Sequence, residues 1–287
     1  MSKLVQISVL PHHLEDEDHI LNKVFEKIEL RNDDVQKWNI RKRSIDARQK
    51  KVTYNLQIEI WLHGEDLPKR EVYTIQDVSQ ANEVVIIGAG PAGLYAALRA
   101  IEGGMKPVIY ERGKDVRSRR RDLAALNNDH IVNPESNYCY GEGGAGTYSD
   151  GKLYTRSKKR GNVLKALEWF VDFGATPDIL VDAHPHIGTN KLPQIITSMR
   201  EGIEKAGGKV FFESKMTDIR HDQQQIAAIQ INDKEWIACD NVILATGHSA
   251  RDIFYLLHKR GIKVQAKPFA IGVRVEHQQE LIDQIQY

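Results

Sequence analysis

The sequence has few cysteines, no long apolar run and no excess of one charge, and each shortage excludes a class of protein. Cys139 and Cys239 lie far apart without a CxxC pair, so neither a disulfide framework nor a zinc site is indicated, and we predict no metal. The 40 Lys and Arg residues nearly balance the 39 Asp and Glu residues, which disfavours nucleic acid or an anionic membrane as the main partner. No apolar run approaches the ~20 residues of a membrane span.

The composition is that of a globular protein of about two domains, because 287 residues with 41% hydrophobic side chains can bury a substantial core. Residues 1–4 lead directly into a strand pattern rather than a signal peptide, so we expect a cytoplasmic protein.

The stretch from Glu83 to Glu111 predicts a strand, a glycine turn, a helix and a second strand. An apolar β-branched run, 84–87, ends at the sequence Gly88-Ala89-Gly90-Pro91-Ala92-Gly93, which opens an Ala- and Leu-rich helix. In such a dinucleotide fingerprint the first glycine makes the turn, the second admits a pyrophosphate, and the third lets helix and strand pack closely. Glu111 ends the second strand at the spacing of the carboxylate that accepts hydrogen bonds from ribose hydroxyls.

A small α+β module precedes this stretch. Strand patterns at 3–10, 35–46 and 52–62 surround a helical pattern from Glu15 to Leu30. The basic run from Arg41 to Arg48 is either a solvated strand edge or a functional contact. We divide the chain into the module (1–79), a Rossmann-like domain (80–266) and the start of a further domain (267–287).

A second glycine-rich segment runs from Tyr138 to Arg156 without a preceding apolar strand. So much glycine indicates either close backbone approach to a flat or anionic group or a plain flexible loop. Later patterns predict an antiparallel hairpin that turns at Asn232-Asp233, and an apolar strand that stops at Gly247 and returns to the parallel sheet. A strand over Phe269–Val275 and a helix over Gln279–Gln286 follow. The predicted fold class is α/β, a Rossmann-like parallel sheet with an inserted hairpin.

The fingerprint, Glu111 and the Thr246-Gly247 strand end together resemble the two-dinucleotide-binding-domain flavoproteins. The glycine segment at 141–153, the Ser44-Ile45-Asp46-Ala47-Arg48 run and the Gly272–His277 segment are similar to a group of uncharacterised NAD(FAD)-utilising dehydrogenases. The resemblance covers nearly all of the chain and implies FAD, with the glycine segment near its isoalloxazine or pyrophosphate. The expected cofactor contacts are Gly88, Gly90, Pro91, Ala92, Gly93, Glu111, Arg112, Gly143, Gly144, Ala145, Gly146, Thr246 and Gly247.

Two departures from that family pattern stand out. The sequence has no second GxGxxG, so NAD(P)H as electron donor would dock without a Rossmann half of its own. It also has no closing Gly-Asp segment after Gly247. We therefore expect a C-terminally truncated chain that binds FAD poorly and has little activity alone.

The leading functional hypothesis is an FAD-dependent oxidoreductase acting on a small-molecule substrate, in which the flavin accepts or donates hydride. Lys152 and His186 are candidates for a group near the flavin, and Cys139 is a candidate redox thiol. The alternatives are an NAD-binding dehydrogenase, or a non-enzymatic nucleotide-binding protein whose N-terminal module contacts RNA or protein.

Overall fold

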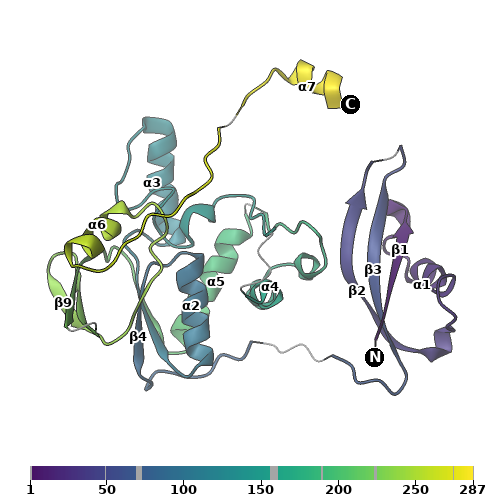
Figure 1. The fold of residues 1–287 in the computed structure, drawn as a ribbon, viewed down its shortest axis with the longest axis horizontal. Coiled ribbons are helices and arrows are strands. Elements are labelled where there is room, and N and C mark those ends of the chain that lie inside the picture. The colour runs from purple at the N-terminus through teal and green to yellow at the C-terminus, as the bar shows by residue number, and fades with distance from the viewer. Residues whose placement is uncertain are drawn as a thin grey trace.

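The computed structural model describes residues 2–48, 50–68, 73–155, 161–188, 190–222, 225–273 and 275–286. Three sheets make up the described part: an antiparallel sheet near the N-terminus, a parallel sheet, and a second antiparallel sheet. Figure 1 shows the first sheet at one end of the molecule and the other two together at the opposite end. The fold class is α/β with an N-terminal α+β module, as the sequence predicts.

The N-terminal module has the sheet order β1-β3-β2, with every pair antiparallel. Its core is made by side chains that alternate along β3 and by one face of α1, among them Leu56, Ile58, Ile20 and Val24. Asp16 caps α1 by accepting a hydrogen bond from the backbone N–H of His19. The elements are β1 (Lys3–Val9), α1 (Glu17–Phe25), β2 (Val35–Asp46) and β3 (Thr53–Leu62).

The parallel sheet has the strand order β10-β4-β5-β6. Its first crossover, β4-α2-β5, is the fingerprint unit. The register pairs Ile87 of β4 with Tyr110 of β5 and with Leu244 of β10, so three strands end side by side. The elements are β4 (Glu83–Ile87), α2 (Pro91–Glu102), β5 (Lys106–Tyr110), β6 (Lys209–Phe211) and β10 (Val242–Leu244).

Both faces of this sheet are covered, which explains why β4 is apolar from Val84 to Ile87. Ile86 and Ile109 point toward α2 and α5 (Leu192–Lys205), whereas Val85 and Val108 point toward the second antiparallel sheet and α6 (Arg251–Lys259). Alternate side chains along each strand therefore belong to two separate hydrophobic cores.

The second antiparallel sheet contains the predicted hairpin and one strand more. The predicted hairpin is present and turns at Asn232 and Asp233, which both adopt left-handed backbone angles, φ 52° and 57°. The hairpin is nevertheless part of a three-stranded meander, because β7 pairs with β8 ahead of it. The strands are β7 (Met216–Asp222), β8 (Gln225–Ile231) and β9 (Glu235–Ala238).

Two further helices complete the domain, α3 (Val116–Asp129) and α4 (Val163–Asp172). Short 3-10 turns lie at Pro11–His13, Asn32–Asp34, Gly144–Gly146 and Pro177–Leu180. Arg43 of β2 joins the module to the turn at Pro177–Leu180 and the residues after it, because its side chain pairs with Asp178 and Asp182 at 3.0 and 2.7 Å. No helix among the described residues is long and apolar enough to cross a membrane.

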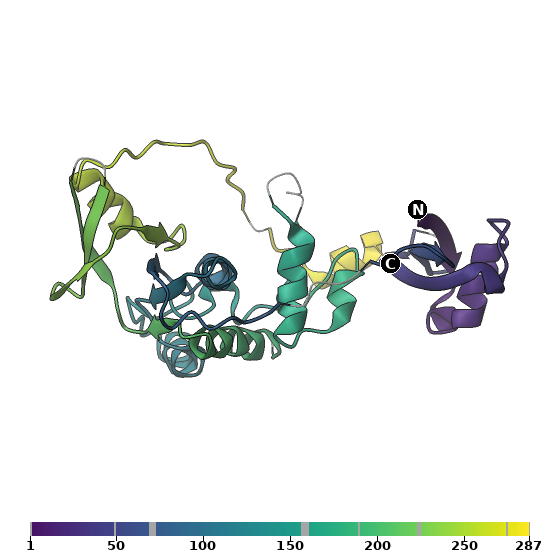
Figure 2. The ribbon, with the colours of Figure 1, turned by 90° about the horizontal axis from the view of Figure 1, so that it is seen from below.

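The predicted strand at Phe269–Val275 is wrong. The described residues of this segment have no regular structure, and Phe269, Ile271 and Val273 are more than 80% exposed. A strand needs a neighbour to accept its backbone hydrogen bonds, and Figures 1 and 2 show this segment running away from the sheets toward α7 (Gln279–Gln286). Arg274, within the same segment, lies outside the described residues. The helix predicted at Gln279–Gln286 is present.

Candidate dinucleotide-binding site

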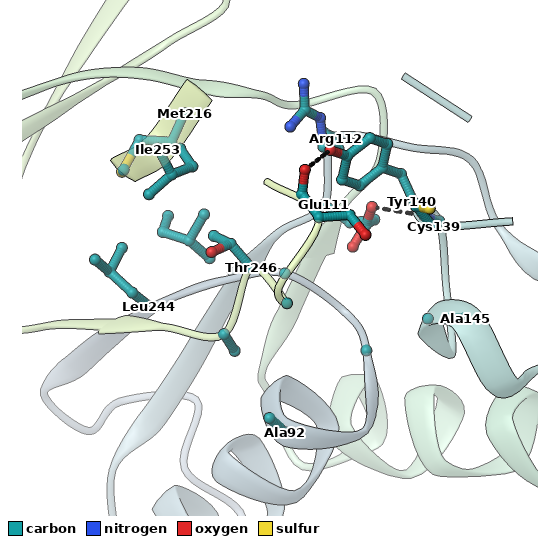
Figure 3. A pocket seen from close by; sticks show the side chains of 18 of the residues that line it. Ala92, Glu111, Arg112, Cys139, Tyr140, Ala145, Met216, Leu244, Thr246 and Ile253 are labelled. Atoms are coloured by element: carbon teal, nitrogen blue, oxygen red, sulfur yellow. Dashed lines mark hydrogen bonds between the residues drawn. The ribbon is translucent and has the colours of Figure 1, made fainter. Parts of the chain in front are cut away.

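A pocket of about 460 Å³ lies where β4, β5 and β10 end. Ligands of open α/β sheets bind at this edge, in the crevice outside the carboxyl ends of the strands. Glu111 lies in its wall, the turn after β4 with Ala92 lies on one side, and Ala145 lies close to that turn (Figure 3). Segments from distant parts of the sequence therefore form one cavity.

The glycine turn is packed as the fingerprint requires. A Cβ on Gly93 would lie 1.8 Å from the carbonyl oxygen of Gly88, so helix α2 could not approach β4 with any other residue there. A Cβ on Gly90 would meet only the Cα of Gly144, at 3.8 Å, and would otherwise face open space in the pocket. Helix α2 begins at Pro91, and its first N–H groups have no partner within the helix. This end of α2 is suited to bind an anion.

Glu111 is only 4% exposed and ties the two glycine segments together. One carboxylate oxygen accepts a hydrogen bond from the N–H of Ala89, at 2.7 Å. The other accepts from Gly113 and Gly141, at 2.8 and 2.9 Å. This role of Glu111 as an acceptor for backbone N–H groups was not predicted from the sequence. The ribose contact stays a prediction, and a carboxylate with two oxygens keeps some accepting capacity beyond these three bonds.

The second glycine segment lies directly against the first. The N–H of Gly143 donates to the carbonyl of Ala89 at 2.8 Å, and a Cβ on Gly144 would lie 3.1 Å from the ring of Pro91. Gly144, Ala145 and Gly146 line the pocket. Gly143 does not line it and instead fastens the segment to the fingerprint turn.

The structure shows which of the other predicted site residues line the pocket. Gly88, Gly90, Pro91, Ala92, Glu111, Arg112, Thr246 and Gly247 line the pocket, while Gly93 supports the turn from behind. Cys139 lines it and is an exposed free thiol. Lys152 and His186 are bridged to each other through their backbones but are not among the residues lining the pocket.

Several pocket residues were not found from the sequence. Ile87, Tyr110 and Leu244 are the last residues of β4, β5 and β10, so a position at the carboxyl end of a predicted strand was the signal that could have found them. Met216, Leu244 and Ile253 gather on one side of the pocket and give it an apolar wall (Figure 3). The remaining ones are Tyr140, Gly141, Ser214, Lys215, Ala245, His248 and Ser249.

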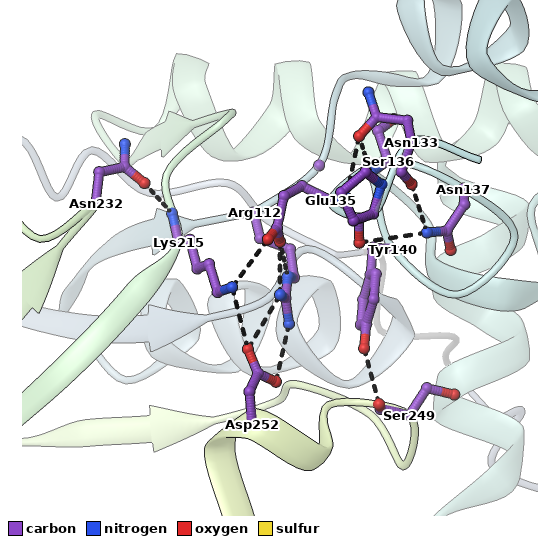
Figure 4. Close-up of polar contacts among 12 residues, drawn as sticks. Arg112, Asn133, Glu135, Ser136, Asn137, Tyr140, Lys215, Asn232, Ser249 and Asp252 are labelled. Atoms are coloured by element: carbon purple, nitrogen blue, oxygen red, sulfur yellow. Dashed lines mark hydrogen bonds and ion pairs between the residues drawn. The ribbon is translucent and has the colours of Figure 1, made fainter. Parts of the chain in front are cut away.

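Arg112 belongs to an ion-pair cluster at the rim of the pocket. Its guanidinium pairs with Glu135 at 2.5 Å and with Asp252 at 3.0 Å, and it lies over the ring of Tyr140 at 4.2 Å. Lys215 pairs with the same two carboxylates, at 2.8 and 3.4 Å (Figure 4). The cluster holds the end of β5, the 135 region, the start of β7 and helix α6 together around one wall.

Acid is expected to weaken this cluster. Burial alone would raise the pKa of Glu135 and of Asp252, but the pairs with Lys215 and Arg112 hold the pKa of each below its ordinary value. A carboxyl whose pKa is lowered on folding stabilises the protein above its unfolded pKa and loses that contribution as the pH falls through the folded pKa. Both carboxylates are more than a third exposed, so we expect only about 0–1 kcal/mol from each pair.

The measurement is the urea midpoint from pH 7 down to 3, for the wild type and for a Glu135→Gln/Asp252→Asn double variant. The wild type should be the more stable at pH 7, and the difference should shrink in the acid range below about pH 4.5, the ordinary pKa of a glutamate. A difference independent of pH would contradict a role for these charges.

Comparison with protein families agrees with this geometry. Residues 83–125 match a family model described as "FAD binding domain". Residues 1–61 match a second model, described as "Domain of unknown function (DUF8436)". The FAD-binding match covers the fingerprint turn, Glu111 and the start of α3.

The chain is also similar to two relatives and to one solved structure. An uncharacterised protein of Clostridium beijerinckii is 36% identical over 99% of this chain and 56% of its own length. Ribosomal RNA dihydrouridine synthase of Haemophilus influenzae is 23% identical over 59% of this chain and 41% of its own length. The chain thus spans about half the length of these relatives. THI4 of Thermovibrio ammonificans aligns with a TM-score of 0.42 and 19% identity, over 64% of this chain and 65% of that one, a likeness too low to carry argument.

Proposed function

We propose that this chain contributes the FAD site of an FAD-dependent oxidoreductase with a small-molecule substrate. The observation that carries the proposal is the meeting of two glycine segments at the carboxyl ends of β4 and β10. The first of these segments lies within residues 83–125, which match an FAD-binding family model. When bound, FAD supplies hydride transfer, which no side chain can perform.

The residues present fit such a cofactor. A Cβ on Gly90 would project into the pocket between the two glycine segments, so the absence of side chains there leaves room for a phosphate beside the backbone. The amino end of α2 offers unpaired N–H groups to the pyrophosphate. Glu111 lines the pocket and would accept hydrogen bonds from ribose hydroxyls, and the apolar wall of Met216, Leu244 and Ile253 would exclude water from a ring of the cofactor.

An NAD-binding dehydrogenase using the same turn is the competing assignment. The two differ in a visible signal, because only a flavin absorbs in the visible range. We expect the absorption bands of FAD to shift when the chain is added, and an excess of NAD to leave the shifted spectrum unchanged. Displacement of FAD by NAD, or NAD binding without any effect of FAD, would favour the competing assignment.

The oxidoreductase part of the proposal needs its own experiment. Under anaerobic conditions, NADH or NADPH added to the chain saturated with FAD should bleach the flavin bands faster than in free FAD. Equal rates with and without protein, for both donors, would leave only a binding role for this chain and contradict catalysis of that half-reaction by it.

Reduction of a uridine in RNA is a second candidate, favoured by the similarity to a ribosomal RNA dihydrouridine synthase. The basic run of the N-terminal module gives it limited support, because three of its arginines already have acidic partners. Arg41 pairs with Glu59, and Arg48 pairs with Asp46. Arg43 pairs with Asp178 and Asp182. The test is to incubate the chain with FAD, NADPH and ribosomal RNA and to measure dihydrouridine by mass spectrometry. A gain over protein-free RNA would establish this substrate, and none would remove the candidate.

A further inference from the structure

Arg119 of α3 is a fully buried cation, 0% exposed, in a stretch of arginines that the sequence presents as polar. Among the described residues it forms no ion pair within 4 Å. Burying an arginine without a directly paired carboxylate is costly unless its donors are satisfied by hydrogen bonds. The burial of this charge therefore needs a physical explanation.

The guanidinium is satisfied almost entirely by the second glycine segment. Its Nε donates to the carbonyl of Asn137 at 2.9 Å, and one terminal nitrogen donates to Tyr138 at 3.1 Å. The other terminal nitrogen donates to the carbonyls of Glu142 and Gly144, at 2.9 and 2.8 Å. The same nitrogen has longer contacts with the carbonyl of Gly141 and the hydroxyl of Thr147. One side chain thus holds the loop across residues 137–147.

These bonds also set which way the loop presents its backbone. In a trans peptide the C=O and the following N–H point in opposite directions. The carbonyl of Gly144 points at Arg119, so the N–H of Ala145 points away from it, and Ala145 lines the pocket. The buried cation thereby turns the carbonyl inward and leaves the neighbouring donor on the ligand side.

The packing around Arg119 is specific to this arrangement. Gly141 has φ +117°, and a Cβ there would lie 2.5 Å from Cδ of Arg119, so the close approach depends on glycine. The ring of Tyr148 lies 5.4 Å from the guanidinium carbon. Burial lowers the pKa of Arg119, while the nearby charges of Glu111 and Glu142 favour its protonated form. An arginine remains charged under such conditions.

We propose that Arg119 is the positioning residue for the cofactor loop: it fixes residues 137–147 so that the backbone at Ala145 faces the dinucleotide. This rests on the proposed function, since the loop is assigned as a wall of the FAD site. Arg119 does not line the pocket. Its substitution should therefore make the loop less ordered, and the loss of order should in turn weaken cofactor binding.

Loop order is measured without any ligand, by hydrogen exchange of peptides covering 137–148. Arg119→Gln should raise exchange there while the peptides of β4 and β5 keep wild-type protection. Arg119→Lys retains the charge but cannot reach this many acceptors, so it should give an intermediate effect. Arg117→Gln is the matched control, because it removes an exposed arginine from the same helix and should leave exchange unchanged.

The second readout is FAD affinity, measured on the same proteins by flavin fluorescence. Arg119→Gln should weaken binding roughly 10-fold or more, Arg119→Lys less, and Arg117→Gln not at all. Unchanged loop exchange in Arg119→Gln overturns the inference, and so does increased exchange with wild-type FAD affinity. Lost protection throughout the sheet would also contradict it by showing a general structural role. A wild-type chain that does not bind FAD even at a large excess of the cofactor would defeat the proposed function instead, while the exchange experiment would still report on the loop.

Discussion

A Gly90→Val protein is expected to fold as the wild-type chain does and to lose most of its affinity for FAD. The fold should survive because a Cβ at Gly90 meets only Gly144, at the ordinary contact distance of 3.8 Å. Binding should fail because the two further methyl groups occupy the pocket beside the amino end of α2. Loss of one or two charge-assisted hydrogen bonds to a phosphate, at about 1.5–3 kcal/mol each, corresponds to roughly 10-fold or much more in affinity.

Two companion variants make this result specific. Gly90→Ala adds the tolerated Cβ alone and should bind FAD with an intermediate affinity. Gly93→Ala should instead reduce the unfolding midpoint in urea, because its Cβ would lie 1.8 Å from a backbone oxygen. Wild-type FAD affinity in a folded Gly90→Val protein would show that this turn is not the phosphate site.

Glu111→Gln is expected to lower the free energy of unfolding by about 2–5 kcal/mol. The buried carboxylate accepts three backbone N–H groups, and a glutamine has one accepting oxygen and places an NH₂ group against the remaining donors. Each buried donor left without an acceptor costs about 1–3 kcal/mol. FAD affinity should fall as well, because the same change loosens both glycine segments and removes a charged acceptor for the ribose.

Urea unfolding gives the stability, and flavin fluorescence gives the affinity under conditions where each protein is folded. Glu83→Gln is the control, since it removes a half-exposed carboxylate from the start of β4 and should cost little. A Glu111→Gln protein as stable as the wild type would contradict the backbone role, and unchanged affinity would remove the ribose assignment.

The fingerprint was predictable because its signal is local. Strand, glycines, helix, strand and acid follow one another within one crossover, so their sequence order fixes their spatial order. The strand ending in Thr246-Gly247 was recognised for the same reason, as an apolar run stopped by glycine. The far wall of the pocket was not, because Met216 and Ile253 reach the site only through the packing of β7 and α6 on the sheet.

Other features depended on partners that a sequence pattern does not name. Phe269–Val275 has the alternation of a strand, but alternation describes a face and not the neighbour that must pair with it. Arg119 lies among arginines of which several are exposed, and only the fold brings five carbonyl groups around it. Glu111 was predicted from its spacing to bind the ribose, while its bond to Gly141 depends on the second glycine segment, 30 residues further along the chain.

The most direct test of the account is a hydrogen-exchange footprint of the wild-type chain with and without saturating FAD. The account predicts slower exchange in three segments, 88–93, 141–147 and 245–249, and no change in the N-terminal sheet of β1, β2 and β3. Protection confined to other parts of the chain, or none at an FAD concentration that saturates the fluorescence signal, would contradict the assignment of this pocket as the FAD site.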